Sequence, residues 1–172
     1  MQERTFSLLT AIRAAAALLW AAALVIAVGD RIPTTASDVT VAAALVLSTY
    51  PLIDAVASFF QARWVNGAIS TTAAVALAVA TFAGDAGAAL IVFGAWAFVS
   101  GAIQLAGALS PRQWPMIISG GVSTLAGLSF VAASGQDEAN LAQLAGYMAV
   151  GAVLYLIWTA RTWRAAPVSA GA

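Results

Sequence analysis

Two ionisable side chains, Arg13 and Asp54, lie inside long apolar runs of this sequence and are the residues best placed to do chemistry. A charged side chain inside a membrane-spanning segment costs several kcal/mol unless it is paired or hydrated. If both runs form helices joined by a short connection, the helices are antiparallel neighbours, and both residues lie ~10 Å below the same end. We therefore expect an ion pair between the two helices. Alternatively, Arg13 extends to the lipid headgroups and Asp54 faces a polar cavity.

Polar side chains of other apolar runs fall at a similar depth and predict a polar layer beside this pair. The layer comprises Ser58, Ser70, Thr71, Ser100, Gln104, Ser119 and Ser123. One interpretation is a site for protons or a small solute, open to the cytoplasm, with Asp54 as the titrating group. The other is a structural ion pair whose neighbouring hydroxyls bond to backbone carbonyls. The sequence places no second carboxylate at this depth for a proton relay, which favours the structural interpretation.

Most catalytic and cofactor chemistry lacks its usual residues in this chain. There is no His and no Cys, which removes the commonest metal ligand, the usual general base and thiolate chemistry. We find no phosphate-binding loop, dinucleotide fingerprint, zinc motif or nucleophile elbow. The formal net charge of zero does not favour nucleic-acid binding. We therefore expect a protein that is not an enzyme and has no cofactor, no metal and no nucleic-acid partner.

The elements that must position the polar residues are six apolar segments. Apolar residues make up 62% of the chain and charged residues 8%, so a soluble protein of this size could not cover its apolar surface. A helix that spans a bilayer needs roughly 20 apolar residues. The predicted spans are about 6–28, 39–60, 65–82, 86–109, 115–134 and 141–159. The sequence thus predicts an all-α polytopic membrane protein, with a single transmembrane domain over residues 1–172.

Arginines are concentrated on alternate connections between these segments, which predicts the orientation. Counted from the N-terminus, one set of connections carries Arg4, Arg63, Arg112, Arg161 and Arg164. The other set carries Arg31 and most of the acids, which are Asp30, Asp38, Asp85, Asp137 and Glu138. Because arginine-rich connections are retained in the cytoplasm, we expect a multi-pass protein in the lipid bilayer of the plasma membrane, with both termini cytoplasmic.

Similar segments recur and predict three repeated helical hairpins. Residues 66–71 resemble residues 119–124, and residues 50–55 correspond in place to residues 96–101. Each hairpin then consists of two helices around a short turn outside the cytoplasm, which makes the repeats parallel. Small residues also recur at four-residue spacing, which lets helices approach closely. The small-residue faces contain Ala17, Ala21, Ala97, Gly101, Ser119, Ser123 and Gly127. They either pack within the bundle or form the interface of a homo-oligomer.

With its three hairpins and its Gly- and Ala-rich segments 93–104 and 118–127, the chain resembles the HdeD-like membrane proteins. The similarity extends over roughly residues 11–160. It implies a six-helix inner-membrane protein, associated in enteric bacteria with acid resistance, and it brings no catalytic residues. Pro51 and Asp54 depart from the small or apolar residues that the repeat would place there.

The sequence leaves more than one class of function open. The first is a non-enzymatic membrane protein of unknown molecular activity, acting in envelope or acid stress as the resemblance implies. The alternative is a small channel or transporter for protons or small solutes that uses the polar layer around Asp54. A third option is a membrane-embedded enzyme or chaperone that acts on lipid.

Overall fold

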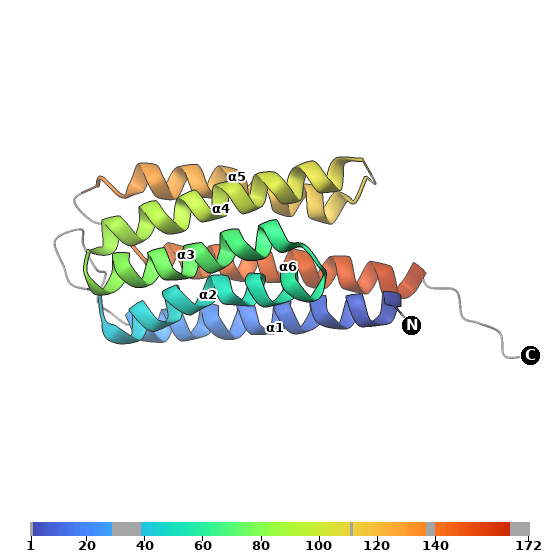
Figure 1. The fold of residues 1–172 in the computed structure, drawn as a ribbon, viewed down its shortest axis with the longest axis horizontal. Coiled ribbons are helices and arrows are strands. Elements are labelled where there is room, and N and C mark those ends of the chain that lie inside the picture. Colours follow the sequence, from blue (N-terminus) through green and yellow to red (C-terminus); the bar gives the residue numbers. More distant parts are fainter. Residues whose placement is uncertain (1, 29–38, 111, 137–139, 166–172) are drawn as a thin grey trace, which may run out of the picture.

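The protein is a bundle of long helices that run side by side (Figure 1). The computed structural model describes residues 2–28, 39–110, 112–136 and 140–165, with side chains from residue 8 to residue 161. Its helices are α1 (Gln2–Val28), α2 (Val41–Phe60), α3 (Trp64–Phe82), α4 (Ala86–Leu109), α5 (Trp114–Ala133) and α6 (Ala142–Ala165). All six are long and apolar enough to cross a membrane. This confirms the predicted all-helical fold with six apolar helices, and the described ranges contain no strand.

The six helices form a closed ring. Each helix packs against its neighbours along the chain, and α6 packs against α1 to close the ring. The most extensive contacts are those of α4 with α5, α2 with α3 and α1 with α6. α1 begins and α6 ends at the same end of the bundle, where the α2–α3 and α4–α5 turns also lie (Figure 1). Inward-pointing side chains meet across the ring, as the rings of Phe93 on α4 and Tyr147 on α6 do.

α4 and α5 pack closely because glycines of each helix face the backbone of the other. Gly94 lies opposite Gly127, and Gly101 lies opposite Gly120. A methyl group added at Gly127 would lie 2.5 Å from the carbonyl oxygen of Gly94. One added at Gly120 would lie 2.6 Å from the backbone nitrogen of Leu105. Small residues permit this approach, and van der Waals packing then stabilises the helix pair in lipid.

The turns that follow α2 and α4 are built alike, and they fix where two arginines lie. Ala62, just after α2, has a left-handed backbone with φ 55°. The N–H of Arg63 then donates to the carbonyl oxygen of Ser58 at 2.8 Å, which is the bond that ends a helix in a Schellman motif. Arg112, with φ 51°, takes the place of Ala62 after α4. We call the end with Arg63 and Arg112 the arginine end, and the opposite end, where Asp85 caps α4, the Asp85 end.

Only part of the predicted charge pattern can be followed in the structure. Asp30, Arg31, Asp38, Asp137 and Glu138 lie outside the described residues, as do the side chains of Arg4 and Arg164. Within the described part, Arg161 is on the last turns of α6 and is exposed, at the same end as the two turn arginines. At the opposite end, the side chain of Asp85 accepts a hydrogen bond from the N–H of Ala88 at 2.8 Å.

A cluster of aromatic rings divides the interior of the ring into two halves. The cluster contains Tyr50, Phe93, Trp96, Phe130 and Tyr147, whose contacting rings have centroids 5.3 to 6.0 Å apart. The apolar half extends from this cluster to the Asp85 end. Its core includes Leu24, Leu47, Leu77, Leu90 and Leu144, all 0% exposed. The polar half extends from the cluster to the arginine end and contains polar side chains and cavities.

Candidate functional site

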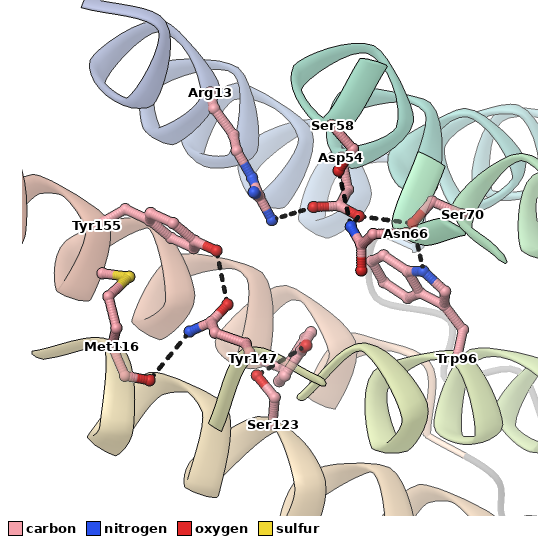
Figure 2. A network of polar contacts seen from close by, with 11 residues as sticks. Arg13, Asp54, Ser58, Asn66, Ser70, Trp96, Met116, Ser123, Tyr147 and Tyr155 are labelled. Carbon is pink, nitrogen blue, oxygen red and sulfur yellow. Dashed lines mark hydrogen bonds and ion pairs between the residues drawn. The ribbon is translucent and has the colours of Figure 1, made fainter. Parts of the chain in front are cut away.

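Asp54 of α2 is at the centre of the polar half, and three side chains donate to its carboxylate (Figure 2). Its Oδ1 lies 2.5 Å from Nη2 of Arg13 on α1. Its Oδ2 accepts hydrogen bonds from Nδ2 of Asn66 at 2.7 Å and from the hydroxyl of Ser70 at 2.6 Å, both on α3. The side chain of Asp54 is only 6% exposed. Charge-assisted hydrogen bonds of this kind replace the water that a buried carboxylate has lost.

A second set of hydrogen bonds orients these donors. Nδ2 of Asn66 also donates to Oγ of Ser58 at 2.7 Å. Nε1 of Trp96 donates to Oγ of Ser70 at 3.1 Å. The Ser70 hydroxyl therefore accepts one hydrogen bond from Trp96 and donates another to Asp54. The result is a buried network that connects α2, α3 and α4 (Figure 2).

Arg13 faces further polar residues on the side away from Asp54. Its guanidinium carbon lies 4.4 Å from the ring centroid of Tyr155 on α6. The hydroxyl of Tyr155 donates to Oε1 of Gln104 at 2.6 Å. Nε2 of Gln104 donates in turn to the carbonyl oxygen of Met116 at 3.2 Å. The side chain of Arg13 is 20% exposed, so this cation is less enclosed than its partner.

Two cavities lie in the polar half, and their linings overlap. The inner cavity is about 60 Å³ and extends from Arg13 to the aromatic cluster. The outer cavity is about 320 Å³ and lies nearer the arginine end, among residues of α1, α4, α5, α6 and the two turns. Both are lined by Arg13, Arg63, Gln104 and Tyr155. We refer to the two together as the chamber. Exposed residues such as Arg63 and Gln113 line its outer part, so it opens toward the arginine end.

The inner cavity contains a polar atom without a partner. Among the described residues, the buried hydroxyl of Ser100 makes no hydrogen bond, although buried polar groups are nearly always satisfied. Ser100 lines the inner cavity, and Gly151 of α6 lines it as well. A Cβ added at Gly151 would meet nothing within 4 Å. Free volume beside an unsatisfied hydroxyl is suited to a small polar molecule.

The charges of the chamber determine what it can bind. Among its described lining residues Asp54 is the single carboxylate, and Arg13 neutralises it. Arg63 adds a positive charge. The described part of the chain contains no group of three or more His, Cys, Asp or Glu side chains that could bind a metal ion. The chamber therefore presents hydrogen-bonding groups and one positive charge that no described lining carboxylate neutralises.

Most of the site residues predicted from the sequence border the chamber or its hydrogen-bond network. Arg13 and Asp54 form the ion pair described above. Ser70 donates to Asp54, Ser100 lines the inner cavity and Gln104 lines both cavities.

Three other residues of the predicted polar layer differ in whether they reach the chamber. Ser123 lines the inner cavity and accepts a hydrogen bond from the hydroxyl of Tyr147 at 3.1 Å. Ser119 is 2% exposed and lines the same cavity. Thr71 is separate from the network, because its hydroxyl donates to the carbonyl oxygen of Gly67 in its own helix at 2.8 Å.

Sequence reasoning missed four residues that complete the site, namely Asn66, Trp96, Tyr147 and Tyr155. Two signals could have found some of them. The spacing from Arg13 to Asn66 equals that from Asn66 to Ser119, so the three have corresponding places in the chain. An aromatic residue also stands one helical turn before each of the chamber residues Asp54 and Ser100.

The small-residue faces pack inside the bundle. Ala97 is 0% exposed, and Ala17 and Ala21 are 7% and 6% exposed. Gly101 and Gly127 face the neighbouring helix of the α4–α5 pair. These faces therefore serve intramolecular packing in this structure, and a homo-oligomer stays a prediction.

No family model matches this chain, and no curated protein and no solved structure matches it. The resemblance to the HdeD-like proteins therefore stays a prediction that rests on short segments. Since a fold alone does not define a function, the geometry of the chamber has to carry the functional argument.

Proposed function

We propose that this chain is a non-enzymatic, multi-pass protein of the plasma membrane that binds a small polar solute in the chamber and moves it across the bilayer. The arginine end faces the cytoplasm, because arginine-rich connections are retained there. Both termini then lie inside. The hairpins α1–α2, α3–α4 and α5–α6 act as three parallel repeats that together enclose the solute site.

The shape of the interior is the observation that carries this proposal. The chamber extends from the arginine end to the aromatic cluster, whereas buried leucines fill the apolar half. A transporter at rest has a site of this kind, close to the middle of the bilayer and accessible from one side. A purely structural ion pair needs no cavity beside it, and unfilled volume reduces stability.

Solute flux through reconstituted protein tests the proposal. Proteoliposomes are transferred to isosmotic solutions of urea, glycerol or sodium acetate, and swelling is followed by light scattering. We expect at least one of these solutes to enter faster than in protein-free liposomes. The Gly151→Val variant should slow this entry, because residue 151 lines the inner cavity and a Cβ added there meets nothing within 4 Å.

Gly146 provides a matched control on the same helix. It is exposed, a Cβ there also meets nothing within 4 Å, and it does not belong to the described lining of the chamber. Gly146→Val should therefore leave flux unchanged. Equal flux in all three proteins, or swelling no faster than in empty liposomes, would contradict transport through the chamber.

The envelope- or acid-stress role implied by the resemblance to HdeD-like proteins is a second proposal, at the level of the cell. It is compatible with solute transport, because a transporter can act in a stress response. Survival of a deletion strain after an acid pulse tests it. Survival equal to that of the parent strain would remove the acid-stress role and leave the transport proposal intact.

A further inference from the structure

We infer that the chamber is a binding site for a small soluble carboxylate, held between Arg13 and Arg63. This inference names the solute class and so rests on the proposed function for its role in transport. Binding itself can be measured without any transport.

The charge balance of the chamber favours an anion. In the outer cavity the described lining residues include Arg13 and Arg63 and no acid. In the inner cavity Asp54 already accepts from Arg13, Asn66 and Ser70. The positive charge of Arg63 is therefore left without a carboxylate in the lining. Arginine side chains that line a cavity favour anions in this way.

The available donors match a carboxylate. A guanidinium presents several N–H groups in a planar fork that fits two oxygens at once, and Arg13 uses one terminal nitrogen for Asp54. The buried hydroxyl of Ser100, which makes no hydrogen bond within the described structure, can donate to an oxygen deeper in the chamber. Gln113 also lines the outer cavity, and a glutamine side-chain amide can donate a hydrogen bond near the opening.

The direction of the opening favours a soluble molecule over a lipid headgroup. The outer cavity is lined by α1, α4, α5, α6 and both turns of the arginine end, so its wall runs around the ring. An opening at the end of the ring leads to water, while a headgroup site requires a gap between helices toward lipid. Its volume of about 320 Å³ is at the small end for ligand pockets, which suits an anion of few atoms.

Thermal unfolding in dodecyl maltoside micelles, a detergent without oxyanions, tests the inference. Sodium acetate replaces sodium chloride at constant ionic strength, and the shift of the unfolding temperature gives an apparent affinity. Acetate should raise the unfolding temperature of the unaltered protein. Arg63→Gln should weaken the apparent acetate affinity about tenfold or more, because one charged contact is lost.

Arg112 is the matched control, because it lies in the equivalent turn after α4 and does not belong to the described chamber lining. Arg112→Gln should keep the full acetate shift. Ser100→Ala is a second variant, and it should weaken acetate affinity while the fold is retained. Choline chloride should produce no shift.

Two results would overturn the inference. One is an acetate shift that is absent in the unaltered protein or equal in Arg63→Gln. The other is stabilisation by added phosphatidylglycerol alone, which would assign the arginines to a lipid headgroup. Acetate binding without faster swelling would instead retain this site and contradict the proposed transport, so the two failures are distinguishable.

Discussion

The polar and apolar halves of the bundle are stabilised in different ways. In the apolar half, leucines such as Leu77 and Leu90 are 0% exposed and belong to one buried apolar cluster. In the polar half, Arg13 and Asp54 form an ion pair beside cavities of about 60 and 320 Å³. The first arrangement is typical of a packed core, and the second is typical of a site.

The contrast shows which half of the molecule has the features expected of a functional site. Placing polar groups inside a bilayer is costly, so such groups inside a membrane protein mark binding or transport paths by default. The aromatic cluster separates the halves, and within it Phe93 contacts the rings of Trp96 and Phe130. A packed apolar half can then support a chamber that is not fully packed.

Removal of one charge from the polar half should have the largest effect. Asp54→Asn leaves Arg13 without its anion, and breaking a buried pair in this way costs about 3–5 kcal/mol. We expect the free energy of unfolding in mixed micelles to fall by this amount, while the exposed Arg161→Gln variant changes little. The double variant Arg13→Gln/Asp54→Asn should recover part of the loss. Strictly additive losses would mean that the two side chains do not interact.

Removal of volume from the apolar half should have the next largest effect. Leu90→Ala creates a cavity where the residue is 0% exposed, and such changes cost about 2–5 kcal/mol. We expect the lower end of this range, because moving a leucine out of lipid brings no hydrophobic gain. Leu90→Met should cost much less, and unfolding in mixed micelles measures both. Equal losses in the two variants would argue against a well-packed apolar half.

The α4–α5 pair crosses both halves and offers a sharper test of packing. Gly120→Ala forces a methyl group to 2.6 Å from the backbone of Leu105, and overpacking of this kind costs about 1–3 kcal/mol. At the adjacent Gly121 a methyl group meets nothing within 4 Å, so Gly121→Ala should stabilise the helix by up to about 1 kcal/mol. Denaturation curves of the two variants should shift in opposite directions. Shifts in the same direction would contradict the observed helix pairing.

The smallest effect is expected at the turn that positions Arg63. Ala62 has φ 55°, a conformation that glycine adopts without steric cost. Ala62→Gly should therefore raise the free energy of unfolding by up to about 1 kcal/mol. Unfolding in mixed micelles measures this change. A loss of stability would show that the left-handed turn does not form.

The sequence predicts the helices and part of the site, for clear physical reasons. Continuous apolar runs determine helices in lipid, because every backbone polar group must be satisfied within the segment. The partnership of Arg13 and Asp54 follows from depth and from the short connection between their helices. Both arguments use only the types of residues and their positions along the chain.

Contacts across the ring could not be predicted in this way. Tyr155 contacts Arg13 because α6 closes the ring onto α1, and no local pattern encodes that closure. Phe93 of α4 contacts Tyr147 of α6 in the next hairpin for a similar reason. The cavities are the space left by all six helices together, so they emerge only from the assembled structure.

Accessibility of the chamber to water from the arginine end is the central claim, and cysteine labelling tests it most directly. The chain contains no cysteine, so a single introduced thiol reports one position. Gly151→Cys should react with a membrane-impermeant thiol reagent in inside-out membrane vesicles and stay unreactive in right-side-out vesicles. Leu90→Cys, in the apolar half, should not react in either. A thiol at residue 151 as unreactive as the one at residue 90, or one that reacts only in right-side-out vesicles, would contradict the account.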